Sequence, residues 1–317
     1  MARKARNPLV DRAVYLAIRL AVAVLQTLPP QLALTLADFV AWLAYRVDKR
    51  HRAVAAENIG HAFPLLTPLA VDDMVRATYR HFARMAVEMV VLPRRLHVTS
   101  WRRYVNMNPW APGLAPVFSP RPVLLVTAHF GNWEASGYMI GLTGLKTYAI
   151  ARVLDNPHLE RFVKRLRQGT GQTLVAKKDD FDRLTGVLRA GGKLATLADQ
   201  DAGPRGLFVD FFGRPASTHK AVALMALEYD APLVVFGVPR TPPPPGVPGA
   251  VDGMFFTQVT EDVIDPRDYA GRPDAVRAIT ERYTAALERL IRRHPEQYFW
   301  LHRRWKTRPA ARKAKAA

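Results

Sequence analysis

A histidine and a carboxylate stand five residues apart, shortly after an apolar run. The run, residues 123–126, consists of valine and leucine and predicts a buried strand. A neutral imidazole can take a proton from an alcohol near pH 7, and a carboxylate that accepts the other ring N–H fixes the tautomer and stabilises the imidazolium. The spacing of His129 and Glu134 therefore favours a general-base pair acting on a hydroxyl that the substrate supplies.

The residues between this pair predict a sharp turn into a helix. Gly131 permits a backbone conformation that other residues rarely adopt, and Asn132 is a suitable helix cap with Glu134 in the first helical turn. Open α/β sheets place their sites at the carboxyl ends of strands, and backbone N–H groups at such a turn can stabilise an oxyanion. The structural alternative is that His129 only ends the strand while Glu134 lies on a solvated helix face.

Polar side chains also follow two other predicted strands. Arg152 ends one of them, where an arginine can hold a phosphate or a carboxylate; a plain surface charge is the alternative. Asp199, Gln200 and Asp201 follow another. Paired acids at a strand end can bind a metal, accept sugar hydroxyls or hold basic side chains. Because no third acid or histidine stands at a fitting spacing, we predict no metal site.

Strands and helices alternate from residue 123 onward. Helical periodicity is expected after Asn156-Pro157, before Gly191-Gly192, and over residues 216–229 and 276–290, whereas strands are expected over residues 123–126, 146–153, 173–176, 193–198, 208–212, 233–238 and 254–259. Such alternation predicts an α/β fold with a mostly parallel central sheet covered by helices.

The composition narrows the class of protein. The 317 residues suffice for one large α/β domain or two small ones, and a hydrophobic content of 49% supports a sizeable core. The chain has no cysteine, which excludes a disulfide framework, a thiol nucleophile and a cysteine-based metal site. The net charge of +19 predicts anionic partners: a membrane leaflet, a phosphorylated lipid, nucleic acid or an acidic protein.

The first fifty residues predict helices that dock on a membrane. Residues 9–28 are mostly apolar and about as long as a span, but Asp11, Arg12 and Arg19 interrupt them. Arg12, Arg19 and Gln26 recur at intervals of seven, so they share a narrow stripe of the helix that we expect to face lipid headgroups. These features favour an interfacial helix over a free span. A helix packed on the domain is the alternative, and the interrupting charges disfavour a cleaved signal peptide.

We divide the chain into membrane-associated helices (1–50), a catalytic domain (51–308) and a basic tail (309–317) that we expect to be disordered. Residues 298–306 combine aromatic with basic side chains, which resembles a nucleic-acid-binding segment. Because these aromatics stand close to an apolar helix, packing is the favoured role, and we predict no nucleic-acid partner.

Several motifs in order give the chain a family resemblance. The sequence resembles the late lipid A acyltransferases, the lauroyl/myristoyl-transferase branch of the lysophospholipid acyltransferase superfamily. The motifs that carry this resemblance are His129-Phe130-Gly131-Asn132-Trp133-Glu134, Ala198-Asp199-Gln200-Asp201-Ala202-Gly203, Phe208-Val209-Asp210-Phe211-Phe212-Gly213 with Ala216-Ser217-Thr218, Glu57-Asn58-Ile59 with Ala62-Phe63-Pro64, and Trp300-Leu301-His302-Arg303-Arg304-Trp305-Lys306.

The resemblance implies transfer of a fatty acyl group from an acyl-carrier-protein or coenzyme A thioester to a hydroxyl of a glycolipid, at the cytoplasmic face of the inner membrane and without a cofactor. It implies that His129 is the general base and Glu134 its partner, and that Asn132, Arg152 and the loop from Asp199 through Gln200 to Asp201 contact substrate. Phosphatidylinositol-mannoside acyltransferases share these motifs, so such an acceptor is an alternative. A hydrolase using the same pair on water, and a non-catalytic module that binds anionic membranes, are the remaining alternatives.

Overall fold

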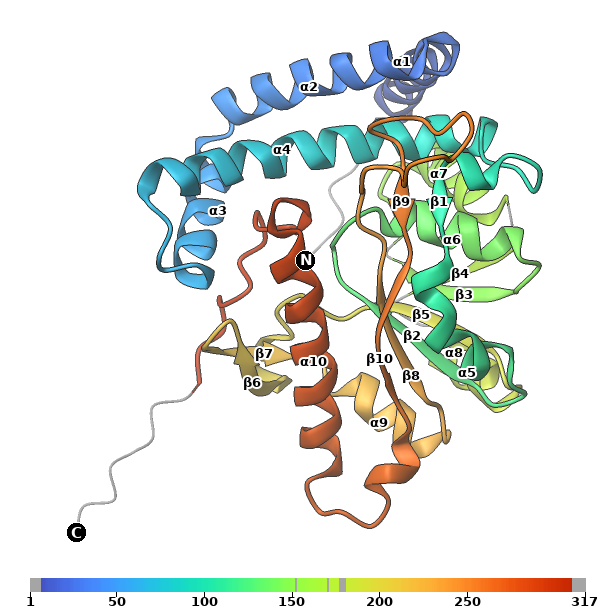
Figure 1. Ribbon diagram of the computed structural model, residues 1–317, viewed down its shortest axis with the longest axis vertical. Helices are drawn as coiled ribbons and strands as arrows, with labels where there is room; N and C mark the ends of the chain where they lie inside the picture. The colour runs from blue at the N-terminus through green and yellow to red at the C-terminus, as the bar shows by residue number, and fades with distance from the viewer. Residues whose placement is uncertain (1–6, 152, 170, 177–180, 310–317) are drawn as a thin grey trace.

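The computed structural model describes residues 7–151, 153–169, 171–176 and 181–309 (Figure 1). Arg152 and residues 310–317 of the expected basic tail therefore lie outside the described residues. The fold is α/β, with a central sheet, helices on both of its faces and a layer of N-terminal helices along one side (Figure 1). The predicted fold class is confirmed.

The central sheet has six strands in the order β10-β8-β2-β5-β3-β4. Five strands run parallel and β10, at one edge, runs antiparallel to β8. The strand that leads to His129, β2, lies between β8 and β5, and all of its residues are buried. The strand bounds are β2 Val123–Thr127, β3 Thr147–Ala151, β4 Gln172–Ala176, β5 Lys193–Leu197, β8 Leu233–Gly237 and β10 Val259–Ile264.

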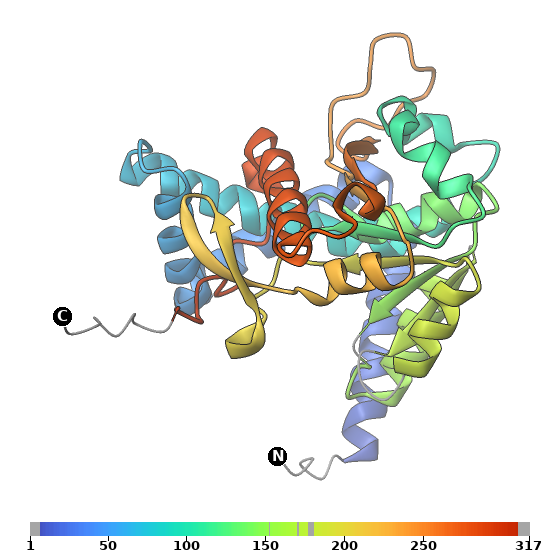
Figure 2. The same ribbon diagram turned by 90° about the horizontal axis from the view of Figure 1, so that it is seen from below.

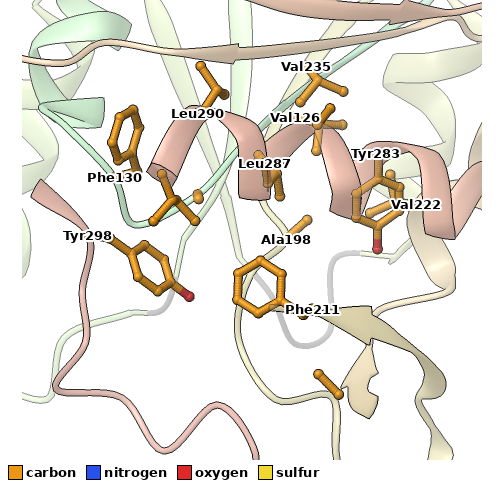
Figure 3. Close-up of a cluster of buried hydrophobic side chains, with 14 of the residues drawn as sticks. Val126, Phe130, Ala198, Phe211, Val222, Val235, Tyr283, Leu287, Leu290 and Tyr298 are labelled. Carbon is orange, nitrogen blue, oxygen red and sulfur yellow. The ribbon is translucent and has the colours of Figure 1, made fainter. Parts of the chain in front are cut away.

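Alternate side chains of the central strands enter two separate cores, as expected for strands buried on both faces. On one face, Val126 of β2 and Val235 of β8 belong to the same buried cluster as Tyr283 and Leu287 of helix α10 (Ala275–Arg293), which Figure 3 shows in close-up. The opposite face packs against α5 (Ala111–Phe118), α6 (Trp133–Leu142) and α4 (Pro68–Val91). The sheet is thus held between two helical layers. The polar residues His129 and Asp199 follow the carboxyl ends of β2 and β5.

The N-terminal region is a series of helices that begin and end at residues of the expected kinds. In α1 (Pro8–Thr27), the Asn7 side chain accepts a hydrogen bond from the Leu9 N–H, and Pro8 occupies the first helical position. Leu28 and Pro29 separate α1 from α2 (Pro30–Val47), which lies along α4 (Figure 1). The third helix, α3, spans Lys49–Ala62. Among the described residues, no helix combines the length and the low polarity that crossing a membrane requires.

Part of the polar stripe of α1 contacts the domain, whereas we expected the stripe to face lipid headgroups. Gln26 donates a hydrogen bond to the Val90 carbonyl at 2.7 Å, and the Arg19 guanidinium lies 4.9 Å from the Phe162 ring centroid. Leu9, Leu16, Leu20 and other apolar side chains of α1 are exposed instead. Arg12 and Arg19 are exposed as well. The stripe therefore contacts the domain through Gln26 and the Arg19 guanidinium, but it is not buried against it.

The region after β5 is the main departure from the predicted elements. A two-stranded hairpin, β6 (Leu207–Phe211) and β7 (Arg214–Thr218), occupies the start of the expected helix over residues 216–229, so the helix itself, α9, spans only Ala221–Glu228. The two loop residues, Phe212 and Gly213, have φ angles of 55° and 74°. Two positive φ angles in a row are typical of a tight hairpin turn, and the Phe residue at the first position hid that signal in the sequence.

The hairpin lies outside the central sheet and beside α10 in both views (Figures 1 and 2). The remaining elements are α7 (Pro157–Gln168), α8 (Phe181–Arg189), and a short parallel pair formed by β1 (Val105–Asn106) and β9 (Phe256–Thr257).

Candidate active site

The site is built where two neighbouring parallel strands end. Strands β2 and β5 pair in register up to Thr127 and Leu197, and the Ala198 N–H donates to the Thr127 carbonyl at 2.9 Å. The chain then places the His129 Nδ1 atom 2.9 Å from the Asp199 Oδ1 atom. The expectation that Glu134 orients His129 is therefore wrong in this geometry, because Asp199, seventy residues away, occupies that position.

The environment of Asp199 keeps its carboxylate charged. Burial raises the pKa of Asp199. The nearby His129 charge and the hydrogen bonds to the carboxylate lower it by more, so the pKa of Asp199 lies below its ordinary value. An ionised carboxylate can only accept, so we assign the His129 proton to Nδ1 in the neutral ring. The Nε2 atom then carries the lone pair of the neutral ring, and the Gln200 Nε2 atom lies 3.4 Å from it.

The imidazole lies among aromatic rings. The ring centroids of Trp133 and Phe299 are 5.1 Å and 6.0 Å from that of His129. Phe299 also donates its backbone N–H to the His129 carbonyl at 2.9 Å. Contacts on both its ring and its backbone restrict the orientation of His129, which a general base requires. Neither aromatic residue was among the predicted site residues, although both belong to motifs that we had singled out.

Glu134 forms a separate ion pair. Its carboxylate accepts two hydrogen bonds from Arg167, at 2.8 Å from Nε and 2.5 Å from Nη2, and its side chain is only 12% exposed. The fork-to-carboxylate arrangement is the strong, geometrically specific form of an ion pair. Arg167 was not predicted, since no sequence signal links the last turn of α7 to the first turn of α6.

Asn132 has a structural position rather than a position in the open site. Its Oδ1 atom accepts from the Ala135 N–H at 2.8 Å and caps α6, as predicted, while its Nδ2 atom donates to Glu88 at 2.7 Å. The residue has no exposed surface, so the expectation that it contacts substrate is not supported. Gly131 has φ 59°, and a Cβ atom there would lie 2.2 Å from the Val238 carbonyl oxygen.

The expected oxyanion donors at this turn are already engaged. The Gly131 N–H donates to the Gln297 carbonyl at 3.0 Å, and the Asn132 N–H donates to the Val238 carbonyl at 2.8 Å. The Gln200 side chain, in contrast, is a described donor that lies close to the Nε2 atom of His129.

Asp201 connects its loop to the C-terminal segment. Its carboxylate accepts from the Thr307 hydroxyl at 2.8 Å, and its backbone N–H donates to the His302 Nε2 atom at 3.1 Å. Burial lowers the pKa of His302, which favours the neutral ring that this acceptor role requires. Of the predicted site residues, the structure thus brings together His129, Asp199 and Gln200. It places Asp201 in a supporting position, and Arg152 lies outside the described residues.

A cavity of about 320 Å³ extends from His129 between α6 and the sheet. The polar side chains that line it include those of Glu134 and Arg167. The rest of its wall is largely apolar and includes Leu125, Ile140, Ile150, Leu174, Leu197 and Phe236. An apolar cavity with a general base at one end is suited to a substrate with a long apolar part and a reactive polar head.

Comparison with known proteins gives consistent results. The chain is 27% identical over 274 residues to the lipid A biosynthesis lauroyltransferase of Escherichia coli (strain K12), covering 84% of this chain and 83% of the relative. It is 26% identical over 270 residues to the lipid A biosynthesis palmitoleoyltransferase of the same strain, covering 82% and 80%. A lipid A biosynthesis acyltransferase of Haemophilus influenzae is 24% identical over 274 residues, covering 83% and 80%.

The family model for bacterial lipid A biosynthesis acyltransferases matches residues 3–307, which include the His129–Asp199 pair and the cavity beside it. The match is continuous across the N-terminal helices, the sheet and the segment after α10. The chain therefore belongs to the bacterial lipid A biosynthesis acyltransferase family.

Proposed function

We propose that this protein transfers a fatty acyl group from an acyl-carrier-protein or coenzyme A thioester to a hydroxyl of a lipid A precursor. The observation that carries the proposal is the His129–Asp199 pair at one end of an apolar cavity. The family match favours a lipid A precursor over a phosphatidylinositol mannoside as the acceptor, and an enzyme over a non-catalytic membrane-binding module.

The proposed reaction is a direct transfer. His129 Nε2 takes the proton of the acceptor hydroxyl while that oxygen attacks the thioester carbonyl carbon, and Asp199 stabilises the imidazolium through Nδ1–H. The new C–O bond gives a tetrahedral oxyanion, which collapses as the C–S bond breaks. The departing thiolate then takes the proton from His129. These steps use the two substrates and the side chains of His129 and Asp199, with no acyl-enzyme and no cofactor.

We assign two further roles within this scheme. The Gln200 amide, 3.4 Å from His129 Nε2, donates a hydrogen bond to the developing oxyanion once the acceptor hydroxyl takes its place at the imidazole. The cavity between α6 and the sheet holds the acyl chain of the donor, because its wall is apolar and His129 lies at one end. The thioester carbonyl would then lie beside the base.

We also propose that α1 and α2 rest on the cytoplasmic face of the inner membrane. Exposed large apolar side chains are concentrated on these helices and include Leu9, Leu16, Leu20, Phe39, Trp42 and Val47. An outward apolar face on a chain of net charge +19 is suited to an anionic bilayer surface. Leu16→Lys with Leu20→Lys should reduce flotation with vesicles that contain anionic phospholipid, whereas the exposed Leu224 of α9, changed to Lys, should not. Equal flotation of all three proteins would contradict this attachment.

The transfer itself is tested with His129→Ala. The purified protein is incubated with a labelled acyl donor and a detergent-dispersed lipid A precursor, and the acylated product is identified by mass. Loss of the general base should lower turnover by about 10²–10⁴-fold. A thermal unfolding profile like that of the unmodified protein shows that the variant is folded. Normal turnover by folded His129→Ala protein would exclude the mechanism.

A further inference from the structure

A buried polar network lies directly behind the turn that follows His129. Glu88 of α4 has no exposed surface, yet its carboxylate binds the Arg240 guanidinium, at 2.8 Å from Nε and 2.8 Å from Nη2. Arg240 follows β8, and its backbone exchanges two hydrogen bonds with the Gln297 side chain, at 2.8 Å and 2.9 Å. Three distant segments of the chain therefore meet in this network.

The network makes direct hydrogen bonds to the turn. The Asn132 Nδ2 atom donates to Glu88 at 2.7 Å, and the His81 Nε2 atom donates to the Gly131 carbonyl at 3.1 Å. The Arg240 Nη1 atom in turn donates to His81 Nδ1 at 3.0 Å. Burial and the adjacent Arg240 charge lower the pKa of His81, which favours the neutral ring that both of these bonds require.

The cost of this arrangement points to a role beyond stability. Removing a carboxylate and a guanidinium from water is expensive, and replacing such a buried pair with apolar residues is often neutral or stabilising. Every bond from the pair toward the site ends on Gly131 or Asn132, either directly or through His81. These two residues connect His129 to the first turn of α6.

We infer that Glu88, Arg240 and His81 are positioning residues, which hold the Gly131–Asn132 turn so that the His129 ring keeps its place between Asp199 and the acyl cavity. The inference rests on the proposed function, because it assumes that His129 is the general base. None of the three side chains lines the cavity, so they act through the turn and not on substrate.

A double variant separates positioning from stability. Glu88→Leu and Arg240→Met, made singly, each leave one buried charge without its partner, so each should lower the unfolding temperature and the activity. The double variant removes both charges and should regain thermal stability. If the network positions His129, kcat of the double variant should remain lower by about 10²-fold, as for a misplaced catalytic group, with an unchanged KM for the acyl donor.

A control pair accounts for general effects of removing an ion pair. Arg282 of α10 binds Asp262 of β10 with the same fork geometry, at 2.9 Å and 2.8 Å, although this pair is more exposed than Glu88 and Arg240. It lies far from the turn in the sequence and on the α10 side of the sheet. Arg282→Met with Asp262→Leu should leave kcat unchanged. Recovery of both stability and kcat in the Glu88→Leu/Arg240→Met protein would overturn the positioning role.

Variants of His81 keep the inference testable if the double variant does not fold. His81→Gln retains an Nε2 donor for the Gly131 carbonyl, whereas His81→Leu does not, so the Gln variant should have the higher kcat at equal KM. Equal kcat values for the two folded variants would contradict the inference. His129→Ala, assayed in parallel, distinguishes the two levels: if it turns over normally, the proposed mechanism fails, whereas if it is inactive while the double variant is active, only the positioning role fails.

Discussion

Two carboxylates lie near His129, and they differ in both origin and partner. Asp199 comes from the end of β5 and binds the imidazole, whose charge changes during proton transfer. Glu134 comes from the first turn of α6 and binds the Arg167 guanidinium, which stays charged. Only the first pair can take part in moving a proton at neutral pH. A carboxylate that neighbours the histidine through strand pairing is therefore better placed than one that neighbours it in the sequence.

Of the substitutions at these two carboxylates, Asp199→Asn should lower turnover the most. The amide can still contact His129 Nδ1, but it cannot stabilise an imidazolium as a charge does, and it can donate to Nδ1 and so favour the wrong tautomer. Turnover should fall by about 10²–10⁴-fold, close to the loss in His129→Ala. Steady-state transfer with a labelled donor measures it, and a His129→Ala/Asp199→Asn double variant should be no worse than His129→Ala alone.

The pH dependence of stability tests the interaction between Asp199 and His129 independently of activity. Because the pKa of Asp199 in the folded protein lies below its ordinary value of 3.8, the carboxylate adds stability that is fully present above that value. This contribution is lost as the pH falls through the lower folded value. The difference in unfolding free energy between the unmodified protein and Asp199→Asn should therefore shrink as the pH falls below about 4. A difference that grows over this acidic range would contradict the lowered pKa.

The sequence was sufficient for the fold class and for the place of His129 just after a buried strand, and insufficient for the carboxylate that contacts its ring. The apolar run of β2, the glycine turn and the Asn132 cap each rest on local chemistry, and each is present in the structure. The partner depends on β5 returning to lie beside β2, between β2 and β3. Strand order is set by the packing of the whole sheet, so no spacing in the sequence reveals it.

The same limit explains the other errors. The period of the polar stripe on α1 was visible, but the contacts of Gln26 and Arg19 with the domain depend on Val90 and Phe162, which are distant in the sequence. Likewise, Asn132 has the chemistry of a substrate contact, and only the approach of Glu88 shows that its amide is already satisfied inside the protein. Long-range partners decide the roles of residues whose types are known locally.

Glu134→Gln should have a smaller effect than Asp199→Asn. The change leaves Arg167 beside the cavity without a charged partner, which should disturb the cavity wall and lower turnover by about tenfold, equivalent to about 1.4 kcal/mol. Adding Arg167→Met removes the uncompensated charge and should recover part of the activity. Transfer assays on the single and the double variant measure the loss of turnover and its recovery. A loss as large as that in Asp199→Asn, with no recovery on changing Arg167, would make Glu134 a participant in catalysis and would reverse the comparison.

Changes to the apolar wall of the cavity should alter substrate choice with the least effect on turnover of the best donor. Ala149 of β3 and Phe236 of β8 both line the cavity and neither touches His129 in the contacts described above. Ala149→Leu adds volume to the wall and should shift preference toward shorter acyl chains, whereas Phe236→Leu removes volume and should shift it toward longer ones. Each methylene group of the acyl chain that gains or loses its place in the cavity changes the discrimination between donors by about 1–3 kcal/mol.

Competition between labelled donors of different chain length measures the shift in preference. Because the preferences of the two variants should shift in opposite directions, each variant controls for nonspecific damage in the other. Unchanged preference in both folded proteins would show that the acyl chain lies elsewhere.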